Sequence, residues 1–308
     1  MCPSLRKDRK TVAWHTLGRD RIEQDQENTH MNDSNIKEYL SQIGIRKISE
    51  LDTALLETYG EKEGRRHIEK LTELFDQSEG RLVYGSGDTL YLHRQDELVD
   101  YWNQSLPLSI LAASFYDRVF FRRVMAYLVQ YDTFLGGDIL DMGCGNGILT
   151  CFLALLHPDT SVTGLDLSQN AVSAATELSK TLHLNNIQLI RPSGHLQKKY
   201  DTLFSCRTVH ENIAWKPLCE EPKAAILSIE ELTKRHKKYA AELSAMIKSH
   251  GYLISVERYD DDNTYAGLVN AFNRSGLCPI RSTHIQFSCK NGDGTATFQA
   301  MVFEKNEV

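Results

Sequence analysis

The sequence has no apolar run long enough to cross a bilayer. A membrane-spanning helix needs about 20 consecutive apolar residues, and charged residues, 25% of the 308, interrupt every stretch of that length. The N-terminus also lacks the apolar segment of a signal peptide, and acids such as Asp8 and Glu23 argue against a transit peptide. We therefore expect no membrane partner and a cytoplasmic protein.

Cysteine pairs at metal-binding spacing are also missing. The seven cysteines are Cys2, Cys144, Cys151, Cys206, Cys219, Cys278 and Cys289. No two of them form the C-x-x-C pair that zinc sites use, and an odd number does not suit a disulfide framework. We predict free thiols in a reducing compartment and no metal site.

The chain has no excess of positive charge. Its 35 Lys and Arg against 41 Asp and Glu give a formal charge of −6. Such a protein has no general attraction to a phosphate backbone, which argues against nucleic acid as a partner. The one basic cluster, 234–238, is explained more simply as a solvated helix face than as an RNA contact.

The pattern along the chain divides it into three segments. Residues 1–33 are rich in charge and amides and have no apolar period, which predicts a disordered tail, with Met31 as a candidate natural start. Residues 34–132 are mainly helical in pattern, with a short hairpin expected near 82–92, and predict an N-terminal cap or substrate domain. Residues 133–308 form the third segment.

In this third segment short apolar runs alternate with amphipathic ones, as in a parallel sheet covered by helices on both faces. We predict parallel strands at 139–142, 162–167, 187–190, 202–206 and 252–257. The last two strands, about 280–289 and 295–304, are joined by so few residues that they must pair antiparallel. The fold class is therefore α/β with seven strands, mostly parallel.

A glycine loop follows the first of these strands. It reads Asp141-Met142-Gly143-Cys144-Gly145-Asn146-Gly147. Glycines there accept a tight turn and let a ligand approach the backbone. Asp166, 19 positions beyond Gly147, falls at the end of the second strand, where a carboxylate can bind ribose hydroxyls.

A dinucleotide-binding enzyme is the competing interpretation, and two details disagree with it. The G-x-G-x-x-G pattern needs a glycine at position 148, where Ile148 stands. Asp141, two residues before Gly143, would repel a pyrophosphate and attract an ammonium group. The loop therefore favours a cationic nucleoside without phosphate.

These residues resemble the first motif of the class I S-adenosylmethionine-dependent methyltransferases, D-x-G-x-G-x-G, which Asp141, Gly143, Gly145 and Gly147 match. The resemblance covers about 135–305. It implies a Rossmann-like sheet behind the helical cap and S-adenosylmethionine as cofactor, with Asp141 on the methionine amino group and Asp166 on the ribose. The other predicted cofactor positions are Cys144, Asn146, Leu167, Ser193, Gly194, Cys206 and Arg207.

The chain departs from the family pattern after the third strand. Many relatives place an acid there that holds the adenine amino group, and this chain reads Arg191-Pro192-Ser193-Gly194-His195. Ser193 or a backbone carbonyl could replace the acid.

The methyl acceptor should meet the loops after the fourth and fifth strands, because ligands of open α/β sheets gather at the carboxyl ends of the strands. His210 is the preferred general base, since imidazole titrates near neutral pH, and Glu211 is the second catalytic candidate. A loop-packing role for His210 is the alternative, and Glu211 or Glu257 could instead orient the acceptor. Arg207 could meet an acidic substrate or form a surface ion pair.

No N-P-P-Y follows the fourth strand. The resemblance therefore does not extend to enzymes that methylate exocyclic amines of adenine or glutamine side chains. The leading hypothesis is a methyltransferase acting on oxygen or nitrogen of a small molecule. The alternatives are an RNA or protein methyltransferase and a non-catalytic S-adenosylmethionine-binding protein.

Overall fold

The computed structural model of the chain describes residues 33–79, 83–85, 88–90, 95–192, 198–209, 227–259, 261–291 and 294–307. Apart from Asp33, the tail predicted over 1–33 lies outside these residues. Within the described residues, no helix is both long enough and apolar enough to cross a membrane.

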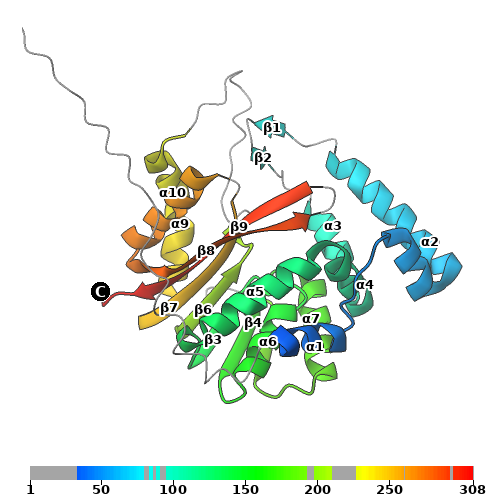
Figure 1. Cartoon of the computed structure of the whole chain (residues 1–308), viewed down its shortest axis with the longest axis horizontal. Helices are drawn as coiled ribbons and strands as arrows, with labels where there is room; N and C mark the ends of the chain where they lie inside the picture. The colour runs from blue at the N-terminus through cyan, green and yellow to red at the C-terminus, as the bar shows by residue number, and fades with distance from the viewer. Residues whose placement is uncertain are drawn as a thin grey trace, which may run out of the picture. The chain divides into compact units, whose positions relative to one another are not determined.

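The centre of the protein is a seven-stranded sheet with the strand order β5-β4-β3-β6-β7-β9-β8 (Figure 1). The strands are β3 (Asp138–Met142), β4 (Ser161–Leu165), β5 (Ile187–Ile190), β6 (Tyr200–Cys206), β7 (Ile247–Arg258), β8 (Leu277–Asn291) and β9 (Gly294–Lys305). The first five pair in parallel, and β9 pairs antiparallel with both β7 and β8. The predicted fold class is confirmed.

The strand order reverses at β3, which lies between β4 and β6. From β3 the chain first winds outward to β4 and β5, and then returns to the other side of β3 for β6 and β7. The connections that leave β3 and β6 therefore diverge, and they open a crevice at the carboxyl ends of these strands. This edge of the sheet is the expected ligand site.

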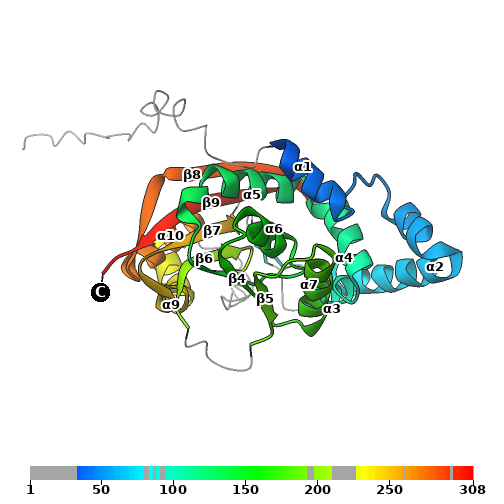
Figure 2. The ribbon, with the colours of Figure 1, turned by 90° about the horizontal axis from the view of Figure 1, so that it is seen from below.

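Helices cover both faces of the sheet (Figures 1 and 2). On one face lie α1 (Asp33–Gln42), α5 (Arg118–Gln130), α6 (Ile148–Leu156) and α7 (Gln169–Thr181), and on the other lie α9 (Ile229–Ala245) and α10 (Asp262–Arg274). Successive strand residues point to opposite faces. Phe204 accordingly belongs to the first core and Leu203 to the second.

The predicted capping box begins α9. Ser228 Oγ accepts from the backbone N–H of Glu231 at 3.3 Å, and the Glu231 carboxylate accepts from the backbone N–H of Ser228 at 2.9 Å. These two bonds satisfy N–H groups that a helix start leaves without partners. The box fixes where the chain returns to the sheet after residues 210–226, which lie outside the described ranges.

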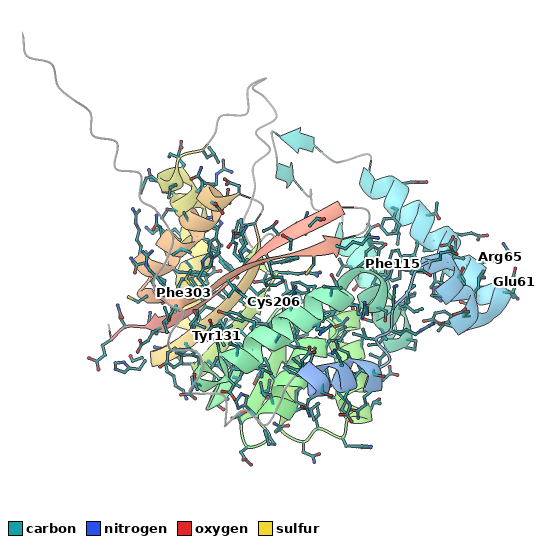
Figure 3. All side chains as sticks on the ribbon, viewed as in Figure 1. Glu61, Arg65, Phe115, Tyr131, Cys206 and Phe303 are labelled. Atoms are coloured by element: carbon teal, nitrogen blue, oxygen red, sulfur yellow. The ribbon has the colours of Figure 1, made fainter. Side chains whose placement is uncertain are left out.

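Three helices of the N-terminal part have a small core of their own. They are α2 (Leu51–Glu79), which is kinked at Gly60, α3 (Gln95–Trp102) and α4 (Leu106–Ala112). Tyr101, Trp102 and Tyr116 pack in or against this core, which favours a packing role for these aromatic residues. The outer surface of α2 is charged, and Arg65 Nε donates to Glu61 across one turn (Figure 3).

The helices α1 and α5, by contrast, share the core of the sheet. Ile36 and Val124 belong to the same cluster as Phe152 of α6 and Ile254 of β7. The division between a cap at 34–132 and a cofactor domain at 133–308 stays a prediction. The hairpin expected near 82–92 is present, with β1 (Val83–Gly85) paired antiparallel to β2 (Asp88–Leu90).

Tyr39 joins α1 to the helix that follows the glycine loop. Its hydroxyl donates to the carbonyl of Ile148 at 2.7 Å in a buried position. Tyr39→Phe should lower the free energy of unfolding by about 0.5–1.5 kcal/mol, the usual worth of one hydrogen bond, as measured by denaturant unfolding. Tyr131→Phe, which loses an exposed bond to Ser282, should change it by less than about 0.5 kcal/mol. Equal losses in the two variants would contradict the buried role of Tyr39.

Candidate cofactor and acceptor site

The glycine loop joins β3 to α6 and is tied to the neighbouring strand. The backbone N–H groups of Gly143 and Cys144 both donate to the carbonyl of Leu165, at 2.8 and 2.9 Å. Leu165 is the last residue of β4, so these bonds fix the loop at the reversal point of the sheet. The N–H of Gly147 then closes the turn on the carbonyl of Cys144 at 3.0 Å.

Two of the loop glycines pack so closely against other segments that a Cβ would collide with them. Gly147 has φ of 77°, and a Cβ there would lie 2.6 Å from the Cβ of Ala175 on α7. Gly143 has φ of 73°, and a Cβ there would lie 2.5 Å from a methyl carbon of Thr208. Both positions demand glycine because any side chain is strained and collides. The loop is thus pressed against α7 and against the segment after β6.

Gly145 differs, because its open side faces empty space. A Cβ built there meets no atom within 4 Å, and its N–H is held by the carboxylate of Asp166 at 2.8 Å. The loop is fixed by contacts on one side and carries no side chain on the other, so a ligand can lie directly on its backbone. The residues therefore fit a nucleoside on this side of the loop.

Asp141 is a buried carboxylate without a described cationic neighbour. Its side chain lies on β3, it is 2% exposed, and it accepts a hydrogen bond from the hydroxyl of Thr150 at 2.5 Å. Burial raises the pKa of this carboxyl to about 7, and the nearby charge of Asp166 adds to the rise. A buried charge needs a partner, and the ammonium group of S-adenosylmethionine fits that need.

Asp166 and Leu167 follow β4 and differ in how they meet solvent. The half-buried carboxylate of Asp166 accepts from Gly145 and, at 2.8 Å, from the N–H of Ser168. A carboxylate has about four acceptor positions, so two remain for ribose hydroxyls. Leu167 is 73% exposed, more than any other large apolar side chain in the described residues, and offers an apolar surface to a base. Both roles stay predictions.

Cys144 and Asn146 serve the loop itself. Cys144 is 7% exposed, and burial raises the pKa of its thiol well above the ordinary value, so the thiol is unreactive. Asn146 Oδ1 accepts from the N–H of Ile148 at 3.3 Å, at the start of α6. All five cysteines in the described ranges are free thiols.

Cys206 is the last residue of β6 (Figure 3), and Arg207 follows it directly in the chain. The Arg207 guanidinium donates to Asp117 at 2.8 Å and lies 5.0 Å from the ring of Phe120. Asp117 ends η1 (Ala113–Asp117), a π-helical turn between α4 and α5, and such turns are frequent at functional sites. The geometry favours the ion-pair interpretation of Arg207, and it ties the N-terminal part to the acceptor edge.

Glu257 is wholly buried at the end of β7 and holds the neighbouring loop. One carboxylate oxygen accepts from Ser205 Oγ at 3.0 Å, and the other accepts from the N–H of Val209 at 3.3 Å. Tyr239 from α9 joins the group through bonds to Ser205 and Thr208 at 2.8 and 2.6 Å. The described contacts of Glu257 position the chain just before His210.

The structure thus brings Asp141, the glycine loop, Asp166 and Leu167 together, with Cys206 and Arg207 on the next strand. Ser193, Gly194, His210 and Glu211 lie outside the described residues. Sequence reasoning missed the two hydroxyls that support the site, Thr150 and Thr208. Thr150 did leave a signal in the sequence, because it is a hydroxyl residue in a helix that is otherwise apolar. The structure shows that its side chain is fully buried.

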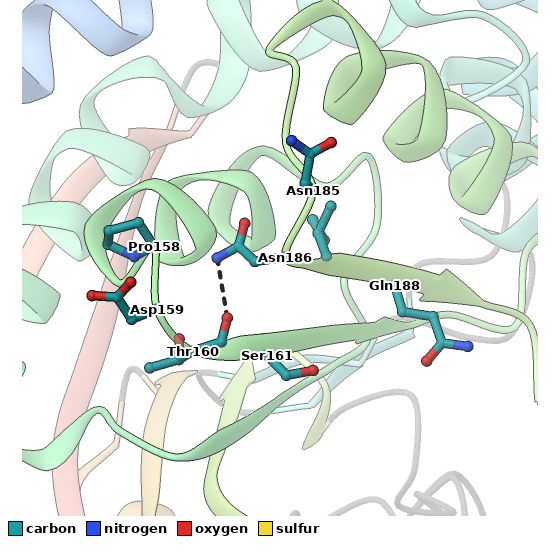
Figure 4. Close-up of a pocket in the computed structure, with 8 residues that line it drawn as sticks. Pro158, Asp159, Thr160, Ser161, Asn185, Asn186 and Gln188 are labelled. Atoms are coloured by element: carbon teal, nitrogen blue, oxygen red, sulfur yellow. Dashed lines mark hydrogen bonds between the residues drawn. The ribbon is translucent and has the colours of Figure 1, made fainter.

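A shallow depression of about 430 Å³ lies at the other edge of the sheet, at the amino ends of β4 and β5 (Figure 4). The Asn186 amide there donates to the carbonyl of Thr160 at 3.1 Å and closes the turn that enters β4. The depression is far from the glycine loop in the strand direction, and it contains none of the predicted site residues. Its amide contacts are explained by the turn.

Residues 134–279 match the model of a protein family described as "Methyltransferase domain". This stretch is a class I methyltransferase domain. S-adenosylmethionine is its cofactor, in agreement with the prediction from the glycine loop. The matched residues run from just before β3 to the start of β8, and so they include the whole parallel part of the sheet.

The chain is similar to several curated bacterial proteins. A release factor glutamine methyltransferase of Vibrio cholerae is 25% identical over 169 residues, which are 52% of this chain and 58% of that protein. A ribosomal RNA small subunit methyltransferase C of Pseudoalteromonas translucida is 35% identical over 82 residues, 25% of this chain and 23% of that protein. The match therefore spans little more than half of the length of the first relative and less than a quarter of the second.

The chain is also similar to solved structures. The magnesium protoporphyrin IX methyltransferase of Synechocystis, solved with its cofactor bound, has a TM-score of 0.43 and 16% identity. The match covers 85% of this chain and 100% of that one.

The expectation of a small-molecule partner, with nucleic acid disfavoured, is wrong. The argument against nucleic acid rested on the net charge of the whole chain, and the argument against glutamine and adenine acceptors rested on the absent N-P-P-Y. The relatives nevertheless include enzymes named for ribosomal RNA and for a protein glutamine. Net charge averages over the entire surface and says nothing about the loops that meet the acceptor.

Replacing Asp141 by Asn should remove a pH dependence of stability. The pKa of this carboxyl is about 7 in the folded chain against an ordinary 3.8. Its protonated form therefore stabilises the unliganded protein fully below about pH 4, and that stabilisation is lost as the pH rises through about 7. Denaturant unfolding between pH 5 and 8 should show a steeper decline in the parent than in Asp141→Asn.

The same variant should bind S-adenosylhomocysteine about 10- to 100-fold more weakly at pH 8, because a charge-assisted hydrogen bond is lost. Asp159→Asn, in an exposed turn, is the matched control and should keep both parent behaviours. An Asp141→Asn protein with unchanged affinity and an unchanged pH profile would remove Asp141 from the cofactor site.

Gly147→Ala and Gly145→Ala should separate stability from binding. Gly147→Ala should cost roughly 2–5 kcal/mol of unfolding free energy, because strain and a collision with Ala175 add together. Gly145→Ala should cost only about 1–2 kcal/mol, since no atom stands in the way, yet it should weaken S-adenosylhomocysteine binding at least tenfold. Denaturant unfolding and calorimetry measure the two quantities, and the reverse pattern would contradict the assigned open side of Gly145.

Proposed function

We propose that this chain transfers the methyl group of S-adenosylmethionine to an acceptor atom on a protein or an RNA. The observation that carries the proposal is the buried carboxylate of Asp141 beside the open side of Gly145. This pairing suits a cationic nucleoside without phosphate. The relatives named for a protein glutamine and for ribosomal RNA support a macromolecular acceptor.

The residues of the site act by holding and aligning the reactants. When bound, S-adenosylmethionine supplies an electrophilic methyl group. Asp141 would neutralise its amino group, Asp166 would accept from the ribose hydroxyls, and Leu167 would cover a face of the base. Fixing the donor in this way lowers the entropic cost of reaction, which is the main contribution that an in-line displacement requires from the protein.

The acceptor would enter at the carboxyl ends of β6 and β7. His210 is proposed as the base that removes a proton from the acceptor, with Glu211 beside it in sequence as the group that orients the acceptor. Glu257 would support both by holding Val209. The residues Cys206–Val209 do not spell N-P-P-Y, so we propose an acceptor oxygen or nitrogen whose proton the base removes, rather than a planar amide.

The N-terminal part would shape the acceptor side. Asp117 contacts Arg207 directly, so η1 stands beside the entrance to the acceptor loop. We propose that residues 34–132 act as the substrate domain. We also propose a cytoplasmic location, which the free thiols of the described cysteines support.

Transfer of a radiolabelled methyl group tests the proposal. The purified protein is incubated with labelled S-adenosylmethionine and a cell extract, and the acid-insoluble fraction is then treated with protease or ribonuclease. Label should appear in that fraction and be released by one of the two enzymes. Label confined to acid-soluble products would overturn the macromolecular acceptor and point to a small molecule.

The turnover number of His210→Ala tests the proposed base. Loss of a general base should lower the turnover number about 10²- to 10⁴-fold and leave the affinity for S-adenosylhomocysteine unchanged. His250→Ala, an exposed histidine at the opposite edge of the sheet, is the matched control and should retain full turnover. Full activity of His210→Ala would exclude it as the base.

A further inference from the structure

The chain has no acid where the family pattern places one for adenine. From Arg191 to Tyr200, the segment that leaves β5, there is neither Asp nor Glu. The exocyclic amino group of adenine is a hydrogen-bond donor, and a carboxylate is its strongest natural acceptor. A cofactor site without this contact would discriminate weakly between adenine and bases that lack the amino group.

A carboxylate from a distant part of the chain stands at this edge of the site. Asp100 of α3 accepts from the hydroxyl of Ser168 at 2.7 Å and from the side-chain amide of Asn170 at 2.8 Å. Ser168 directly follows Leu167 and begins α7. The acid is therefore placed one residue beyond the two positions that we assign to the ribose and the base.

The contacts of Asp100 leave its charge intact. Both donors are neutral, and in the described part of the chain Asp100 forms no ion pair. Two of the roughly four acceptor positions of a carboxylate remain free. An exposed acid that is oriented by neutral donors is a prepared acceptor for a further hydrogen bond.

The helix that carries Asp100 is rigidly placed. Leu98 and Trp102, four residues apart, are 9% and 8% exposed and bury one side of α3 in the cap core. Val99 and Asp100 lie between them on the exposed side. Figure 2 shows α3 and α4 beside α7, and contacts between α4 and α7 agree with that placement.

We propose that Asp100 recognises the 6-amino group of the cofactor's adenine and replaces the acid missing after β5. Leu167, which is 73% exposed and directly precedes Ser168, provides the apolar surface on which the ring lies. The proposal rests on the cofactor assignment of the methyltransferase domain. It makes the N-terminal part a component of the cofactor site as well as of the acceptor site.

Calorimetric titration with two ligands tests the proposal. S-adenosylhomocysteine carries the 6-amino group, and S-inosylhomocysteine carries a carbonyl oxygen in its place. The parent should prefer the adenosyl compound at least tenfold. Asp100→Asn should weaken adenosyl binding about tenfold and leave inosyl binding equal or tighter, because the new amide can donate to the carbonyl oxygen.

Glu97→Gln is the matched control. It removes an exposed acid from the same helix, α3, and it should keep the parent preference for the adenosyl compound. If Asp100→Asn lost affinity for both ligands equally, Asp100 would only join α3 to α7, and the proposal would be overturned. An unchanged preference would overturn it as well. A parent protein that binds neither ligand would instead refute the cofactor assignment.

Discussion

The charge of one buried carboxylate constrains the whole cofactor site. Asp141 is placed by the central strand of the sheet, it is closed off by α6, and its described hydrogen bond comes from Thr150. Burying a charge without a cation is costly, so the unliganded protein holds this group poised between its two protonation states. A ligand that brings an ammonium group removes that cost. On our assignment, a preference for a sulfonium amino acid over a dinucleotide phosphate would follow from the sign of this one charge.

The proposed acceptor site combines residues inside the matched family region with residues outside it. Residues 134–279 supply the sheet and the glycine loop. The N-terminal part reaches them at three places, where Tyr39 meets Ile148, Asp100 meets Ser168, and Asp117 meets Arg207. Each contact lies next to a different component of the site. Similarity over the cofactor domain therefore leaves the substrate open, because on our proposal residues 34–132 also shape the acceptor site.

The sequence predicted what local pattern determines. Alternating apolar segments located every strand of the main sheet, and the short link after Lys290 required the antiparallel end. Strand limits were less accurate, since β7 begins at Ile247 and not at Tyr252. Contacts between residues far apart in the sequence could not be predicted from local pattern. Asp100 and Ser168 lie 68 positions apart, and no spacing rule joins a cap helix to the start of α7. The hydrogen-bonded group around Glu257 likewise includes Tyr239 from a separate helix.

Proton release on ligand binding tests the central claim most directly. At pH 7 a carboxyl with a pKa of about 7 is about half protonated, and an ammonium partner should ionise it fully. Calorimetry of S-adenosylhomocysteine binding at pH 7, in buffers that differ in ionisation enthalpy, counts the protons exchanged. The account predicts release of about half a proton by the parent and none by Asp141→Asn. Binding by the parent without proton release, or equal release by both proteins, would contradict it.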